Sequence, residues 1–381
     1  MPQSGTPHPA PEPALGATIR DLRTALGWSQ TRLAAALCDA AGHDTITREF
    51  VSRWENGRRT PGPYWMRHLA AVLQTPVELL ERARVDRRQF LTSIAGAAIA
   101  PAVTSDLIEH GFAAALHGYP TPDDWEHRVD VYGRDYMTSG AADIQKRLAA
   151  DLVVLQQQLD TPAMWATAAK LAVLYAKTFP GSDGARAVTW YRYAAEFADR
   201  SEDTATRVWV RGRAAIALGY EGAALGVANL LADQALAIDD RPSLGRVNAV
   251  MGKAHVAALR GDRATALTLV DEGRRVFDRV GSDDAPSDYA VPWWRYNIFT
   301  SLLAARLGEE RLAVEAQDEA ARHLPATLPR FRTHLELHRG LMLARQGDPA
   351  GVDYARAALD QLPPEKHSLT LRMLLREIQA A

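Results

Sequence analysis

Four polar side chains fall on one face of a helix predicted over residues 48–55, and their chemistry suits charged hydrogen bonds with a partner. They are Arg48, Glu49, Ser52 and Arg53. Val51 and Trp54 fall on the opposite face. Because residues three or four apart share a face of an α-helix, this spacing separates an apolar side from a polar side. The polar side therefore faces water or a binding partner.

A second group of residues that could bind a ligand is the pair His334 and His338, which lie one helical turn apart with Glu336 between them. The spacing allows a weak metal site. Glu336 is misplaced for the His-Glu-x-x-His zinc motif and no third ligand is near in the sequence, which favours surface histidines. The chain also carries no P-loop, no Gly-x-Ser-x-Gly motif and no dinucleotide-binding fingerprint. We therefore expect no enzymatic activity, no cofactor and no resident metal.

Short helices must position the polar face of residues 48–55. An apolar stripe with helical spacing precedes them and consists of Leu15, Ile19, Leu22 and Leu26. Gly27 can adopt the left-handed conformation that ends a helix, and Ser29 can cap the next one. The inner face of that second helix carries Leu33, Ala34 and Leu37. Thr47 can cap the third helix, which Asn56-Gly57 ends.

These residues resemble the lambda-repressor-like helix-turn-helix domain, also called the XRE or Cro/C1 type, over about Leu15 to Leu80. The resemblance is carried by Arg23, Ser29-Gln30, Leu33-Ala34, Val51-Ser52-Arg53-Trp54-Glu55-Asn56-Gly57, Arg58, Pro61 and Leu69-Ala70-Leu73. The chain departs from the family pattern between Leu37 and Val51, where a longer segment, Cys38 to Ile46, replaces the usual tight turn.

The resemblance implies that the third helix lies in the major groove of DNA. Arg48 and Arg53 would suit guanine, and Glu49 could accept a hydrogen bond from cytosine. Thr47 and Ser52 complete the predicted DNA-facing set on this helix. For Glu49 the alternative is purely local, because an acidic residue at a helix N-terminus is stabilised by the helix dipole.

The resemblance also implies supporting roles around the third helix. Gln30 would contact a phosphate and brace that helix. Three residues would lie against the sugar-phosphate backbone: Asn56, Arg58 and Arg59. Solvated surface charge is the alternative for Arg58 and Arg59. Arg23 and Glu55 would form an internal ion pair with a structural role.

Charge distinguishes this end of the chain from the rest. Residues 15–88 hold 12 arginines and 8 acidic residues, a balance of +4, whereas the whole chain is −2, so the remainder carries −6. Phosphate binding needs the positive end. The only cysteine, Cys38, excludes a disulfide within one chain and is typical of a reducing cytoplasm. No run approaches the roughly 18 apolar residues of a membrane span, so we expect a cytoplasmic protein without membrane contact.

The sequence predicts four segments: a Pro-rich disordered tail over 1–14, the helix-turn-helix domain over 15–84, a connector over 85–105 and a helical region over 106–381. The connector resembles a twin-arginine export signal at Arg87-Arg88, but it follows a complete domain, which argues against export. Its apolar residues are expected to pack on a helical domain or on a second subunit. They are Phe90, Leu91, Ile94 and Ile99.

The large C-terminal region repeats a helical pattern every 38 to 47 residues, marked by glycines that end helices: Gly184, Gly222, Gly261, Gly308 and Gly347. Small residues such as Ala266, Ala313 and Val352 face inward on the helices that follow. Helical hairpins with this period predict an α-solenoid. The pattern resembles degenerate tetratricopeptide repeats over residues 161–376, with Leu218-Gly219 and Tyr220-Glu221 as a fragment of the signature. The predicted fold is therefore all-α.

Aromatic residues cluster twice in this region, and a solenoid can bind partners on its inner surface. The candidate ligand groove is formed by Tyr191, Arg192, Trp293, Trp294 and Tyr296. The alternative, which we favour, is that the aromatic residues form the core between repeats.

The combined reading is a transcriptional regulator that binds a double-stranded DNA operator as a homodimer. Its helical region would dimerise, sense a peptide or small-molecule effector, or both. The architecture resembles peptide-pheromone receptors that join these two modules. The alternative is an adaptor whose helical region binds a partner protein while the helix-turn-helix serves docking.

Overall fold

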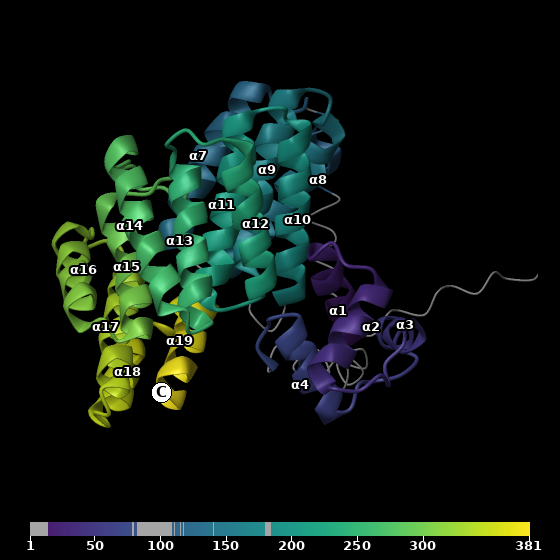
Figure 1. Cartoon of the computed structure of the whole chain (residues 1–381). Coiled ribbons are helices and arrows are strands. Elements are labelled where there is room, and N and C mark those ends of the chain that lie inside the picture. The colour runs from purple at the N-terminus through teal and green to yellow at the C-terminus, as the bar shows by residue number, and fades with distance from the viewer. Residues whose placement is uncertain are drawn as a thin grey trace, which may run out of the picture. The chain divides into compact units, whose positions relative to one another are not determined.

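The computed structural model is all-helical in the part of the chain that it describes, which comprises residues 14–77, 80–81, 109, 111–114, 116, 118–139, 141–179 and 184–381 (Figure 1). The chain divides into two compact units, residues 1–98 and residues 99–381. The all-α prediction is confirmed. Ala14 begins the first helix. The rest of the predicted tail, the connector of residues 85–105 and the boundaries predicted at either end of that connector lie outside the described residues.

Four helices of the N-terminal unit lie wholly within the described residues: α1 (Ala14–Ala25), α2 (Gln30–Ala41), α3 (Arg48–Glu55) and α4 (Pro63–Val72). Their core follows the predicted apolar stripes, since Ile19, Leu33, Leu37 and Val51 are fully buried. The predicted end of the first helix and the predicted start of the second are also confirmed. Gly27 has a φ of +69°, and the Ser29 hydroxyl accepts a hydrogen bond from the Arg32 backbone N–H at 3.1 Å.

The segment that departs from the family pattern is partly helical. Its first residues extend α2 to Ala41, and Gly42 ends that helix with a φ of +72°. The buried thiol of Cys38 donates a hydrogen bond to the Ile46 carbonyl at 3.2 Å. Cys38 and Ile46 are both buried, so the two ends of the segment are fastened to the core of the unit.

Gly16 allows α1 to rest directly on the end of α3. A Cβ atom at this position would lie 2.4 Å from the Glu55 carbonyl oxygen and 2.6 Å from that of Trp54. No other residue fits such a backbone approach without displacing one of the helices. The tertiary contact that fixes the end of α3 therefore depends on a glycine that the sequence patterns did not identify.

The C-terminal unit stacks helices in sequence order (Figure 1). It contains α7 (Pro122–Thr138), α8 (Ala141–Leu155), α9 (Pro162–Thr178), α10 (Gly184–Arg200), α11 (Thr204–Glu221), α12 (Leu225–Ile238), α13 (Leu244–Leu259), α14 (Arg263–Val280), α15 (Trp293–Leu307), α16 (Glu310–His323), α17 (Pro329–Arg345), α18 (Ala350–Asp360) and α19 (Leu369–Ala380). From α9 to α18 each odd-numbered helix packs on the next helix as a hairpin, and successive odd-numbered helices also contact one another. This arrangement of paired helices suggests a helical repeat.

Glycine ends four of the helices as predicted. Gly222, Gly261, Gly308 and Gly347 all have φ between +71° and +80°. The prediction for Gly184 was wrong, because this residue begins α10 rather than ending a helix. A helix-starting glycine and a helix-ending glycine look alike in a sequence when the neighbouring residues are not decisive.

Glycines also form a close seam between α11 and α13. A Cβ on Gly212 would lie 2.1 Å from the Gly245 carbonyl oxygen, and one on Gly219 would lie 2.8 Å from that of Gly252. On each helix the two glycines are seven residues apart, so they lie on the same face of that helix. The sequence predicted small residues within hairpins, whereas this seam joins the first helices of two consecutive hairpins.

Candidate nucleic-acid interface

The outward face of α3 presents the polar residues that the sequence placed there. Arg48, Glu49 and Arg53 are exposed, while Val51 and Trp54 on the opposite face are buried. Ser52 is half-buried between the two faces. The amphipathic spacing of α3 is thus sufficient to hold two guanidinium groups and one carboxylate on a single open surface.

Thr47 occupies the N-cap position of α3, but its hydroxyl does not cap a backbone N–H. It donates to Oε2 of Glu49 at 2.7 Å instead. This hydrogen bond lowers the pKa of Glu49. The Glu49 carboxylate is therefore an ionised hydrogen-bond acceptor at neutral pH, which is the state that a base amino group requires.

A buried ion pair supports α3 from behind, as predicted. Nε of Arg23 donates to Oε1 of Glu55 at 2.6 Å, and its Nη2 donates to Oε2 at 3.0 Å. The remaining amino group, Nη1, donates to the Trp28 carbonyl at 2.6 Å. Glu55 is fully buried. Arg23 therefore joins α1, the turn before α2 and the end of α3 through one guanidinium group.

Two more residues complete this support. Nε2 of Gln30 donates to Oε2 of Glu55 at 2.8 Å, which commits its amide nitrogen to bracing α3. Nη2 of Arg20 donates to the Glu55 carbonyl at 3.2 Å and to Oδ1 of Asn56 at 2.9 Å. The sequence reading missed Arg20, although it lies one turn before Arg23 on the same helix face. Its spacing was the available signal.

The turn that follows α3 places further cationic side chains beside this helix. The guanidinium carbons of Arg53 and Arg59 lie 5.9 Å and 5.1 Å from the centre of the Phe50 ring. The backbone N–H groups of Arg58 and Arg59 both donate to the Arg53 carbonyl, at 2.9 Å and 3.2 Å. This turn keeps Arg58 and Arg59 exposed beside the polar face of α3. Their predicted phosphate contacts, and that of Asn56, stay predictions.

The candidate ligand groove is largely closed. Tyr191, Trp294 and Tyr296 are 2%, 6% and 3% exposed, so they belong to the core between helices. Trp293 is half-buried and donates its indole N–H to Oε2 of Glu319 at 2.9 Å. Arg192 pairs with Glu196 one turn further along α10. The three buried aromatic residues therefore form the core between helices and not a ligand groove, as the alternative interpretation predicted.

The interpretation of His334 and His338 as surface histidines was wrong. Both are buried, and the Tyr220 hydroxyl lies 3.2 Å from Nδ1 of His334 and 2.9 Å from Nε2 of His338. The hydroxyl of Ser301 lies 2.9 Å from Nδ1 of His338. These hydrogen bonds use protein partners from α11 and α15, which a periodicity argument within α17 cannot locate. His255, also buried, lies 3.3 Å from Nη1 of Arg306.

These three buried histidines should make the C-terminal unit sensitive to acid. Burial, with Arg306 and Arg330 nearby, lowers the pKa of His255 and His338 well below the usual value and that of His334 to about 3. Below pH ~6.5 the unfolded chain takes up protons that the folded unit does not. The free energy of unfolding therefore has its full value above pH ~6.5. Below this pH it falls by about 1.4 kcal/mol per pH unit for each histidine.

Urea unfolding followed by far-ultraviolet circular dichroism between pH 7.5 and pH 5.5 measures this loss. His338→Gln should reduce the pH dependence, because it removes one of the three groups. His323→Gln, at an exposed position, should leave it unchanged. A free energy of unfolding that stays constant over this pH range would contradict the expectation.

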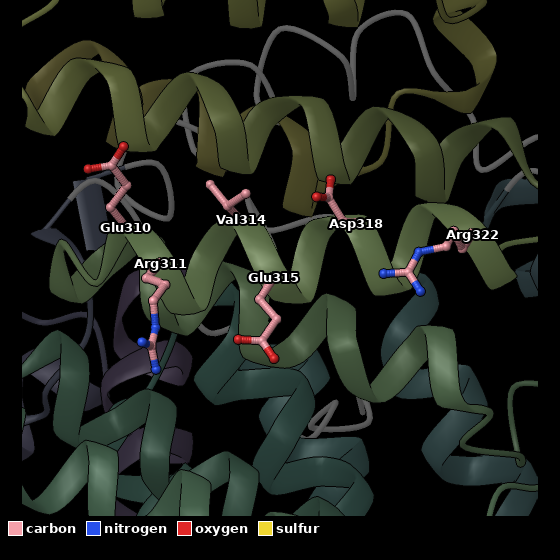
Figure 2. Close-up of a pocket in the computed structure, with 6 residues that line it drawn as sticks. All are labelled: Glu310, Arg311, Val314, Glu315, Asp318 and Arg322. Atoms are coloured by element: carbon pink, nitrogen blue, oxygen red, sulfur yellow. The ribbon is translucent and has the colours of Figure 1, made fainter.

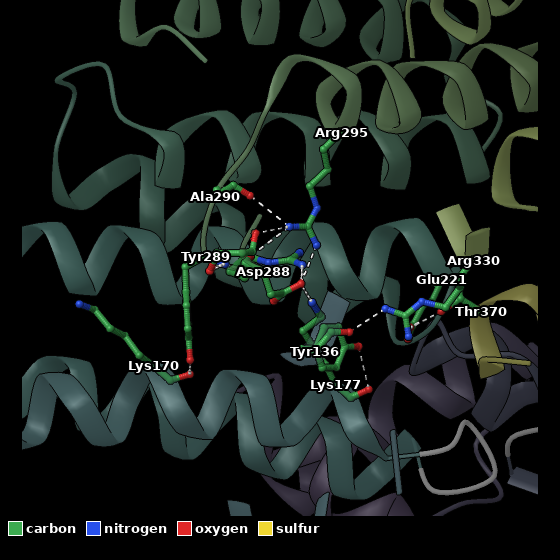
Figure 3. A network of polar contacts seen from close by, with 12 residues as sticks. Tyr136, Lys170, Lys177, Glu221, Asp288, Tyr289, Ala290, Arg295, Arg330 and Thr370 are labelled. Carbon is green, nitrogen blue, oxygen red and sulfur yellow. Dashed lines mark hydrogen bonds and ion pairs between the residues drawn. The ribbon is translucent and has the colours of Figure 1, made fainter. Parts of the chain in front are cut away.

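A buried ionic network lies inside the C-terminal unit (Figure 3). Oδ1 of Asp288 accepts from Nζ of Lys177 at 2.5 Å, Nη2 of Arg213 at 3.0 Å and Nη2 of Arg295 at 2.6 Å. Nη1 of Arg295 also donates to the carbonyls of Asp288 and Ala290, both at 3.1 Å. The segment between α14 and α15 is thereby fastened to α9, α11 and α15.

The charges of this network are unbalanced, with three cations around one carboxylate. Burial opposes ionisation of Asp288, but Arg213, Lys177 and Arg295 outweigh it and hold the pKa of the carboxyl well below its usual range. Burial, followed by Arg213, lowers the pKa of Lys177 well below its usual value. The sequence patterns did not identify Asp288, Lys177 or Arg295 as buried charged residues.

A hollow of about 550 Å³ lies over α16, and Figure 2 shows its lining residues along that helix. The residues are Glu310, Arg311, Val314, Glu315, Asp318 and Arg322. No second element contributes a lining residue, so this feature is one open side of a helix with charges of both signs. It carries no specific chemistry.

Comparison with known families assigns the N-terminal unit. Residues 14–83 match the model of a family described as a helix-turn-helix domain. No curated protein and no solved structure matches the chain. No helix among the described residues is long and apolar enough to cross a membrane. The chain thus carries an N-terminal helix-turn-helix domain, which suggests DNA binding, ahead of a large all-helical region.

Proposed function

We propose that the protein is a sequence-specific DNA-binding transcriptional regulator in which α3 reads the major groove. The observation that carries the proposal is the division of α3 into two faces. Arg48, Glu49 and Arg53 stand exposed on one face, while Arg23 holds the buried Glu55 at the end of the same helix. A reading helix needs both features, because its side chains must reach base edges from a fixed position.

We further propose that the regulator acts as a homodimer and that the C-terminal unit is a tetratricopeptide-like sensor or dimerisation domain without enzymatic activity. One small module contacts few base pairs, and two half-sites about 34 Å apart suit a symmetric dimer. The paired helices of α9 to α18 support a repeat architecture. The exposed cations on α3 favour this function over an adaptor in which the helix-turn-helix serves only docking.

Mobility-shift titration of an operator identified by genome-wide chromatin binding tests the proposal. Arg53→Ala should weaken binding by about 1–3 kcal/mol, or roughly 5- to 150-fold, because a guanidinium group that reads guanine is lost. Arg356→Ala is the matched control, since it removes an arginine that is half exposed on the C-terminal unit. Wild-type affinity should also fall with added salt, by a logarithmic slope of about −0.9 per phosphate contact.

Two outcomes would overturn the proposal. The first is equal operator affinity for the Arg53→Ala protein and the wild type. The second is an affinity that does not change with salt, which would favour the adaptor function because phosphate neutralisation would then be absent.

A further inference from the structure

A small cavity in the C-terminal unit lies where α7 ends and where α8, α17 and α19 begin. Its volume is about 50 Å³, which leaves room for a few waters or for one small oxyanion group. Its described polar lining includes Ser139, Thr327, Arg330, Lys366, His367 and Ser368. The lining is rich in donors. Among the described lining residues four carry hydroxyl groups, one carries a guanidinium and one an ammonium, and none is acidic.

The charge of this cavity comes from Arg330 and Lys366. Among the described residues no carboxylate pairs with Arg330 or Lys366. The buried Asp288 carboxylate is already paired with three cations, and the Glu221 carboxyl accepts a hydrogen bond from the Thr370 hydroxyl at 2.9 Å. The positive potential of Arg330 and Lys366 is therefore available to a ligand.

Arg330 is held in position before any ligand arrives. Its Nη2 donates to the Tyr136 carbonyl at 2.9 Å, and its guanidinium carbon lies 5.4 Å from the Tyr136 ring and 5.3 Å from the Phe331 ring. Nζ of Lys177 also lies 4.2 Å from the centre of the Tyr136 ring. A guanidinium group fixed in this way loses little conformational entropy when it binds an anion.

Helix ends add to the same potential. Ala141 begins α8, Pro329 begins α17, and Ser368 is the N-cap of α19. Helix N-termini carry unpaired backbone N–H groups and a partial positive charge. Nε2 of His367 donates to the Leu362 carbonyl at 2.6 Å, which fixes the imidazole just before α19. These three positive helix ends supplement the cationic side chains, while the C-terminal end of α7, at Met137 and Ser139, adds one negative helix end.

We propose that this cavity binds a small oxyanion, the phosphate or carboxylate group of an effector. Arg330 and Lys366 supply the charge, and the hydroxyls of Ser139, Thr327 and Ser368 supply neutral donors. The inference goes beyond the proposed DNA-binding function, and its binding test uses no DNA. A negative result here would therefore leave the proposal for α3 intact.

The test measures binding of inorganic phosphate and of acetate to the full chain by isothermal titration calorimetry and by thermal shift. Sodium chloride at equal ionic strength is the reference. Phosphate binding identifies a phosphate group as the ligand, and acetate binding identifies a carboxylate. Lys366→Gln, at a half-buried position, should weaken the preferred anion on the order of 10-fold, because one charge-assisted hydrogen bond is lost. Lys253→Gln, on α13 and outside the cavity, should bind as the wild type does.

The proposal is overturned if phosphate and acetate both shift the melting temperature of the wild type no more than chloride does. It is equally overturned if Lys253→Gln weakens binding as much as Lys366→Gln, because the effect would then come from general charge. The wild-type measurement decides the matter even if a variant folds poorly.

Discussion

Asp288→Asn should destabilise the C-terminal unit by about 3–5 kcal/mol, the usual cost of removing one partner from a buried ion pair. The substitution keeps the shape of the side chain but removes the carboxylate with which Lys177, Arg213 and Arg295 all form ion pairs. The buried cations then lose their shared partner and repel one another. Urea unfolding of the full chain, followed by far-ultraviolet circular dichroism, measures the loss, since most helices belong to this unit.

Asp284→Asn is the matched control, because Asp284 is exposed in the same segment between α14 and α15. It should leave the unfolding midpoint unchanged. Adding Lys177→Met to Asp288→Asn removes one of the repelling cations and should recover part of the stability. If Asp288→Asn unfolds at the same urea concentration as the wild type, the network does not stabilise the unit.

Arg23→Ala should destabilise the helix-turn-helix domain, again by about 3–5 kcal/mol. Glu55 is fully buried, and Arg23 donates two of its hydrogen bonds. Without Arg23 the carboxylate retains Gln30 and, at 3.8 Å, Nε of the partly exposed Arg20. Hydrogen exchange of peptides from α1 to α3 in the full chain reports the loss of protection in this domain alone.

The control for Arg23→Ala is Arg32→Ala. Arg32 is exposed on α2, where its guanidinium carbon lies 5.3 Å from the Trp28 ring. The Arg32→Ala substitution should change protection from hydrogen exchange little. Exchange rates in Arg23→Ala that equal those of the wild type would show that the ion pair is dispensable.

The helices of the N-terminal unit could be predicted because each signal is local. Leucine and isoleucine spacing marks the buried faces, and Gly27 and Ser29 mark a helix end and a helix start by their own backbone and side-chain chemistry. The exposed face of α3 followed from the same spacing. The pair of Arg23 and Glu55 needed the family resemblance, because 32 residues separate its members.

The polar groups inside the C-terminal unit could not be predicted in this way. His334 and His338 have the spacing of a surface pair or a weak metal site, yet both are buried. Their hydrogen-bond partners, Tyr220 and Ser301, come from other helices. Asp288 lies in a segment with acidic and small residues that is typical of an exposed loop. Its burial depends on cations 111 and 75 residues earlier in the chain.

The sequence alone determined that the described part of the chain is helical, that its N-terminal unit presents Arg48, Glu49 and Arg53 on one helix face, and that glycine ends four of the repeating helices. Helical period and backbone preference are properties of a few consecutive residues, so they are visible without a fold. Tertiary structure alone decided which charges are buried together and which cations at residues 330 and 366 meet around a cavity. Those distances depend on how distant helices pack, and no local pattern encodes them.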